Sequence, residues 1–214
     1  MKYYLSLFLI LTFVVISFAD ASTIKITANY AEASKQALIA YTTDGSPVIL
    51  EKRNEYTIVT NYLKYDLSTN IAKMTKGISI DYKDLTIKAS TLSFDTNNEK
   101  GNLSNNVFIT ISSTDSAQTT KIWCDKLSID LKNEVYVAIS NNLVKLIQGK
   151  KELYSQKLTY YSSGTYAILE KNAELIDHEN DTITKASKIT FYRKTSKAIL
   201  NGPIEAVITI KKKK

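Results

Sequence analysis

Apolar and polar residues alternate over short stretches through most of the chain. Residues 92–95 read Leu-Ser-Phe-Asp and residues 127–130 read Leu-Ser-Ile-Asp, so every second side chain is apolar. This alternation places the apolar side chains on one face of a β-strand. Thr, Ile, Val and Tyr are frequent after residue 21, and no stretch keeps an apolar stripe at helical spacing for long. The pattern therefore predicts an all-β protein whose strands each bury one face.

The alternation recurs as a repeat of roughly thirty residues, which is typical of stacked architectures. Each strong copy has an apolar anchor, then a small residue, then Leu-x-Tyr, Leu-x-Phe or Leu-x-Ile followed by Asp. A Gly or Asn turn and a short apolar alternation come next, so each unit is interpreted as about three short strands. We expect a rolled antiparallel sheet or a two-layer jelly roll built from about six repeats. The copies are residues 26–30, 58–66, 87–95, 122–130, 153–160 and 184–191.

The parity of positions within a repeat predicts which side chains face the interior. Leu92 and Phe94 share one face of a strand, whereas the anchor Ile87 lies at an odd offset upstream. A bend or bulge near the small residue, Ala89 in this copy and Cys124 in the next, turns both groups inward. The inward-facing candidates are Leu63, Tyr65, Ile78, Ile80, Leu92, Phe94, Val107, Ile109, Leu127, Ile129, Leu143, Leu158, Tyr160, Ile189 and Phe191.

The N-terminal segment has the pattern of an export signal. Lys2 precedes an uncharged stretch over residues 3–19, and Ala19 and Ala21 are small residues at the two positions that a signal peptidase reads. Residues 1–21 are therefore predicted to be a signal peptide, with retention as a membrane anchor as the alternative. One domain over residues 22–210 and a basic tail over residues 211–214 follow.

Charge and reactive side chains exclude several classes of function. The formal charge of +7 includes four lysines in the tail, so the domain itself is only mildly basic and nucleic-acid binding is not expected. Cys124 is the only cysteine and His178 the only histidine. We expect no catalytic site, no metal site and no cofactor, because convergent acid, base or ligand groups are missing. Asp66, Asp95 and Asp130 recur in register before turns, where Asp caps its own backbone.

The repeated phrase resembles the OstA-like family, which includes LptA, LptC and the N-terminal domain of LptD. The resemblance covers residues 24–210 and is greatest to LptA. Tyr161 and Tyr192 stand where the other copies have Asp, and the first copy lacks the Leu. The resemblance implies an open, twisted β-jelly roll whose apolar trough holds the acyl chains of lipopolysaccharide or a related lipid. The inward-facing residues are then the candidates for acyl contact.

The resemblance also implies a function and partners. The leading hypothesis is a non-enzymatic periplasmic lipid carrier that stacks end to end with other OstA-like domains, including copies of itself, and bridges the inner and outer membranes. The terminal strands near residues 24–27 and 206–210 have no capping helix and invite strand addition. One alternative is an LptC-like subunit anchored in the inner membrane. Another is a structural envelope scaffold with a core filled by its own side chains and no lipid cargo.

Overall fold

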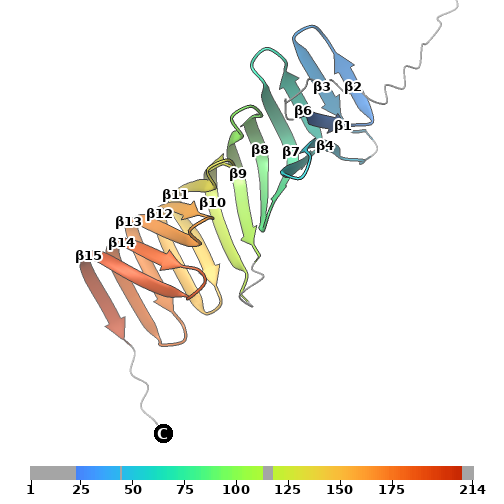
Figure 1. Ribbon diagram of the computed structural model, residues 1–214. Helices are drawn as coiled ribbons and strands as arrows, with labels where there is room; N and C mark the ends of the chain where they lie inside the picture. The colour runs from blue at the N-terminus through green and yellow to red at the C-terminus, as the bar shows by residue number, and fades with distance from the viewer. Residues whose placement is uncertain (1–22, 44, 113–117, 209–214) are drawn as a thin grey trace, which may run out of the picture.

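The computed structural model describes residues 23–208, apart from residue 44 and residues 113–117. The predicted signal peptide and basic tail therefore lie outside the described residues. Within this part of the chain all strand pairings are antiparallel and there is no helix. Figure 1 shows the strands stacked along one long axis, with the first strands and the last at opposite ends. In chain order the strands are β1 (Ile24–Thr27), β2 (Tyr30–Ala33), β3 (Ala37–Tyr41), β4 (Val48–Lys52), β5 (Tyr56–Thr60), β6 (Tyr62–Asp66), β7 (Ile71–Tyr82), β8 (Leu85–Asp95), β9 (Lys100–Ile111), β10 (Thr120–Asp130), β11 (Val135–Gln148), β12 (Lys151–Tyr161), β13 (Tyr166–Asp177), β14 (Thr182–Tyr192) and β15 (Lys197–Ile208).

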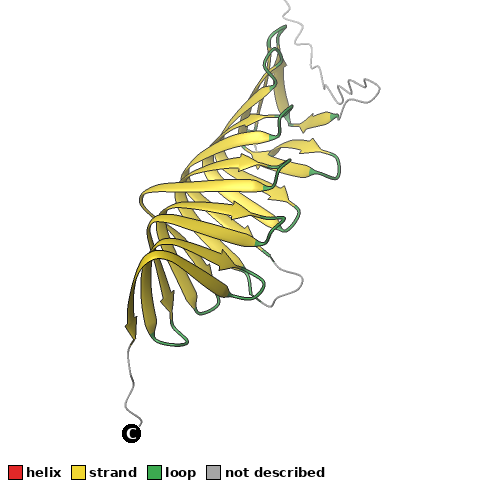
Figure 2. Cartoon of the chain, turned by 60° about the vertical axis from the view of Figure 1, so that its left-hand side comes forward, coloured by secondary structure: helices red, strands yellow, loops and turns green. Residues whose placement is uncertain are grey.

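The sheet forms two walls that face each other. At the N-terminal end the walls are built from separate strands: β2, β3 and β6 form wall 1, and β1, β4 and β5 form wall 2. Strand β7 joins them, because its first half pairs with β6 and its second half pairs with β5. From β7 onward each strand is long and curved and contributes to both walls, as Figure 2 shows. The sheet thus folds over along its length while its edges stay unpaired, as in an open jelly roll.

The bend that folds each long strand lies at the small residue of the repeat. Register shifts occur between Lys88 and Thr91 in β8 and between Cys124 and Lys126 in β10. Strand β9, which pairs with both β8 and β10, bends at Asn105 and Asn106, whose φ angles are 65° and 56°. Asn tolerates this left-handed conformation better than most residues. The predicted bend is confirmed. The prediction of short strands was wrong for β7 to β15, because pairs of short segments continue through the bend as strands of 11 to 14 residues.

The ends of the bent strands form two rows of turns. Rim 1, beside wall 1, consists of the four-residue turns 67–70, 96–99, 131–134, 162–165 and 193–196. Rim 2, beside wall 2, consists of turns 53–55, 83–84, 149–150 and 178–181. Backbone hydrogen bonds stack successive turns of rim 1, as from Leu131 N to Glu99 O at 3.0 Å and from Arg193 N to Thr165 O at 3.0 Å. Rim 1 is therefore continuous across several repeats.

Candidate functional site

The candidate functional site is the apolar interior between the two walls. In β8 the buried side chains alternate with partly or fully exposed ones on either side of the bend. Leu85 and Ile87 face inward from wall 2, and Leu92 and Phe94 face inward from wall 1. The same alternation in the neighbouring strands creates one continuous apolar cluster that extends from Ala40 to Phe191. The interior therefore runs along most of the described chain.

The structure places most of the sequence-predicted site residues in this interior. Tyr65 is half-buried and packs against the cluster, and Leu143 is exposed. The others are at most 3% exposed: Leu63, Ile78, Ile80, Leu92, Phe94, Val107, Ile109, Leu127, Ile129, Leu158, Tyr160, Ile189 and Phe191. Contact between these residues and a lipid stays a prediction.

The inward assignment of Leu143 was wrong, because the bend of β11 is longer than those of the other strands. Its register to β12 shifts between Ile139 and Val144. Asn141 is held outside the ladder by a hydrogen bond from its backbone N–H to Asp125 Oδ2 at 2.8 Å. Leu143 is consequently 45% exposed, and the next residue, Val144, is fully buried. A shift by one residue reverses the face of every side chain in a strand.

Sequence reasoning missed inward residues on the strands that follow each anchor. Met74 and Leu103 are both buried, and each pairs with Leu92 across a neighbouring strand. Leu169 is also buried and pairs with Leu158 and Ile189. The sequence did carry a signal for these residues. Each lies two positions after the small residue of its repeat, which is Ala72, Gly101 or Ala167, and the two positions therefore share one face of the strand.

A second inward row on wall 1 alternates large and small side chains. Gly101 lies between Phe94 and Ile129 in the pairing, and Ala167 lies between Tyr160 and Phe191. A Cβ atom on Gly101 would lie 2.9 Å from Cδ2 of Phe94, closer than carbon atoms pack. The small residues therefore make room for the large neighbours, and the chain fills the central interior with its own side chains.

The C-terminal end of the interior is open. Leu200 and Ile204 of β15 continue the inward face, because they pair with the buried residues Ile189 and Ala186 of β14. No further strand of the described chain covers β15, and the inward-facing Ile204 and Ile208 are 55% and 66% exposed. The apolar interior thus reaches solvent at the free edge of β15.

Buried polar groups mark the side of the interior where the rims lie. Arg193 is 6% exposed and donates from Nη1 to the Tyr160 hydroxyl at 2.5 Å. Tyr160 stacks against Tyr136, whose buried hydroxyl has no hydrogen-bond partner in the described chain. Burial raises the pKa of both tyrosines, so both stay neutral. Burial likewise raises the pKa of Cys124 to about 12, so this thiol is a packing residue rather than a nucleophile.

The polar positions considered as reactive groups have structural roles or lie apart. The carboxylates of Asp95 and Asp130 accept backbone hydrogen bonds from Asn98 and Asn133 at 3.0 Å, which is the expected turn capping. His178 lies in a rim 2 turn with Nε2 3.4 Å from Glu152 Oε1. Among the described residues no group of three or more His, Cys, Asp or Glu side chains is arranged to hold a metal ion.

Comparison with known proteins identifies the architecture. No protein-family model and no curated protein matches the sequence. Among solved structures, the chain is similar to LptH of Pseudomonas aeruginosa, the LptA-homologous periplasmic component of the conserved lipopolysaccharide transport device. The TM-score is 0.51 at 14% identity, over 59% of this chain and 95% of LptH. The chain has an LptA-type fold.

This LptA-type fold confirms the open β-jelly roll and the OstA-like resemblance of the architecture. The matched portion accounts for nearly all of LptH, whereas the present chain extends beyond it. In the part of the chain that the structure describes, no helix has the length and hydrophobicity of a membrane span.

Proposed function

We propose that this protein is a non-enzymatic periplasmic carrier of lipopolysaccharide or a related amphiphile between the inner and outer membranes. The observation that supports the proposal is an apolar interior that runs along an LptA-type fold and reaches solvent at β15. Acyl chains lie in this interior, and the polar headgroup stays in water. Each methylene group that is withdrawn from water contributes roughly 0.8 kcal/mol.

Loading requires the interior to rearrange. Leu92 and Ile129 are 3% exposed, so their apolar surfaces already contact other side chains. An acyl chain takes its place between the walls by separating them, and it replaces contacts between side chains with contacts of the same apolar kind. The bends are the hinge for this separation, because each long strand has one bend between its wall 1 half and its wall 2 half.

End-to-end stacking carries the amphiphile onward. The free edge of β15 offers unpaired backbone groups over 12 residues, and the N-terminal end offers the shorter edges of β1 and β2. A β-strand of a neighbouring OstA-like domain pairs with such an edge and continues the sheet. The partner is a second copy of this chain or a transport component at either membrane.

A photo-crosslinking experiment tests the carrier proposal. A photoactivatable amino acid at Leu92 or Ile129 is expected to capture lipid in cells, because both side chains face the interior. Ser93 and Ser128 are matched controls, since they adjoin these positions and face outward. Capture at the serines alone, or at none of the four positions, would contradict the proposal.

A structural envelope scaffold is the second candidate function. The close packing of Gly101 against Phe94 favours it, because the chain fills its own central interior. Native mass spectrometry of the protein isolated from its host separates the two functions. A carrier retains bound lipid, whereas a scaffold has the mass of the chain alone.

We also propose that residues 1–21 are removed on export to the periplasm. N-terminal sequencing of the mature protein is expected to begin at residue 22. A chain that retains residues 3–19 would instead be an anchored, LptC-like subunit of the same pathway.

A further inference from the structure

Three lysines in or next to the turns of rim 2, or at the end of wall 2, contact equivalent positions of rim 1. Lys52, at the end of β4, forms an ion pair with Glu99, and Lys83 forms one with Glu134. Lys151 Nζ donates to the backbone carbonyl of Ser196 at 2.7 Å. Glu99, Glu134 and Ser196 each hold the last position of a four-residue turn, with φ between 52° and 56°. A lysine therefore reaches the last position of a rim 1 turn in three repeats, twice at a carboxylate and once at a backbone carbonyl.

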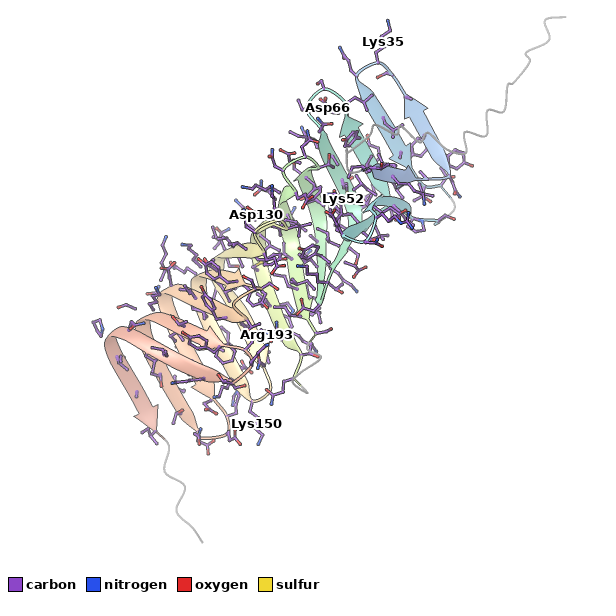
Figure 3. The ribbon with its side chains drawn as sticks, in the orientation of Figure 1. Lys35, Lys52, Asp66, Asp130, Lys150 and Arg193 are labelled. Atoms are coloured by element: carbon purple, nitrogen blue, oxygen red, sulfur yellow. The ribbon has the colours of Figure 1, made fainter. Side chains whose placement is uncertain are left out.

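Other side chains, among them the buried Arg193, also join the rims near these lysines. The Tyr82 hydroxyl donates to Leu131 O at 2.9 Å, and Gln148 Nε2 donates to Arg193 O at 2.7 Å. From rim 1, Arg193 reaches Ser112 O at 3.2 Å and lies 3.6 Å from Asp84 Oδ2. Figure 3 labels Lys52 and Arg193, two of the residues that make these contacts. We call this line of contacts between rim 1 and rim 2 the lateral seam.

The electrostatics of the seam favour its closed form. A hydrogen bond to Glu134 raises the pKa of Lys83. Burial opposes the charged form of Lys52, but the neighbouring carboxylates of Glu55 and Glu99 outweigh it and raise the pKa. Both lysines are therefore fully charged at neutral pH and attracted to rim 1.

Between the two open ends, the seam is nevertheless the one boundary of the interior that side chains alone hold closed in the described residues. In the described residues no strand pairing joins the rims, because the sheet runs from β1 to β15 without closing. Along the walls, by contrast, neighbouring strands are joined by ladders of backbone hydrogen bonds that are interrupted only at the bends. The Lys83 side chain is 56% exposed, so water weakens its ion pair with Glu134, whereas Lys52 and Glu99 are largely buried. Separation at the seam also leaves every ladder and every bend intact.

We propose that the lateral seam is the entrance through which an amphiphile with an anionic headgroup reaches the interior. Its acyl chains pass between the rims, and its headgroup stays at the seam. When the rims separate, Lys83 loses its carboxylate partner on rim 1 and becomes available to the anionic groups, whereas Lys52 keeps Glu55 and Lys151 keeps Asp177 as neighbouring carboxylates. This proposal rests on the carrier function and assigns the loading route to a particular set of side chains.

Cross-linking the rims tests the entrance. The protein carries Lys83→Cys and Glu134→Cys in a Cys124→Ala background, and a bis-maleimide reagent with a cleavable disulfide spacer joins the two thiols. The control pair is Asn102→Cys and Ser128→Cys, whose parent side chains are hydrogen-bonded at 2.8 Å on the outer face of wall 1. The same reagent then joins two strands that are already paired. Loading of fluorescently labelled lipopolysaccharide is followed by stopped-flow fluorescence.

The cross-linked seam is expected to load at least about tenfold more slowly than the uncross-linked protein, because opening becomes limiting. Reduction of the spacer restores the rate, and the control pair loads normally throughout. Equal loading with and without the seam cross-link overturns the entrance but leaves the carrier function standing. If the uncross-linked protein binds no lipopolysaccharide, both proposals fail. Glu134→Gln, which weakens the seam without a cross-link, is expected to load faster than the wild type.

Discussion

The closed centre of the roll and its open C-terminal end carry the same inward pattern but differ in exposure. Phe94 and Leu92, in the centre, are 0% and 3% exposed. Ile204 and Ile208, on the inward face of β15, are 55% and 66% exposed. Binary pattern alone therefore determines which face is apolar. Burial of that face depends on a neighbouring repeat on each side, and among the described strands β15 has such a neighbour on one side only.

The N-terminal end of the roll is built differently from the C-terminal end. There the walls end in two separate strands, β1 and β2, each only four residues long. Ile24 and Ile26 of β1 are half-buried against the core, so little apolar surface is left open. The two ends are thus unlike, so the proposed stacking of one copy's N-terminal end on another copy's C-terminal end would be a heterologous contact. Such a contact would continue a filament in one direction, as the proposed bridge between membranes requires.

The largest expected difference between centre and end is in the stability effect of truncating an inward side chain. Phe94→Ala leaves a cavity among fully buried neighbours and is expected to lower the free energy of unfolding by about 3–5 kcal/mol. Ile204→Ala removes a side chain that is already largely in water and is expected to cost less than about 1 kcal/mol. Urea unfolding of the two variants measures both. Equal losses would mean that the C-terminal end is covered in solution.

Overpacking provides a matched test with a smaller effect. Ala167 and Ala198 hold equivalent repeat positions, but Ala167 has Tyr160 and Phe191 on its two sides, whereas Ala198 has only Phe191. Ala167→Val is expected to destabilise the fold by about 1–3 kcal/mol because neither neighbour can move away. Ala198→Val is expected to change stability by less than about 0.5 kcal/mol, since its other side is open. A thermal unfolding comparison in which both variants lose the same stability would show that β15 is as rigid as the centre.

Local sequence determined the walls far better than it determined the contacts between them. The alternation in Leu92-Ser93-Phe94 is enough to assign an inward face, and the position of Ala89 is enough to place a bend. The error at Leu143 arose where a side chain, Asp125, captured a backbone N–H and lengthened the bend. The seam pair Lys83 and Glu134 is separated by 51 residues, and such a pairing follows only from the way the sheet folds over.

Self-association tests the open end directly. Ile204→Lys places a charge on the exposed inward face of β15 and is expected to reduce concentration-dependent assembly while changing stability by less than about 0.5 kcal/mol. Ser93→Lys adds the same charge on the outer face of the closed centre and is the control. Analytical ultracentrifugation over a range of concentrations reports the assembly. Loss of assembly in both variants would indicate a general charge effect rather than an interface at β15.

The smallest effect concerns the rim 1 turns, which also differ along the molecule. Asp66 precedes the first turn, whereas Tyr161 precedes the fourth. Hydrogen bonds from the Ser68 hydroxyl and from the backbone of Ser68 and Thr69 lower the pKa of Asp66 from its ordinary value of 3.8 to about 2. Because the folded-state pKa is the lower one, the ionised Asp66 stabilises the fold fully above about pH 4. This contribution is lost as the pH falls through about 2. Asp66→Asn is therefore expected to flatten the decline of stability between pH 4 and pH 2 in urea titrations, whereas Tyr161→Phe, at the equivalent position, leaves that slope unchanged. An unchanged slope in Asp66→Asn would mean that the cap forms equally well in the unfolded chain.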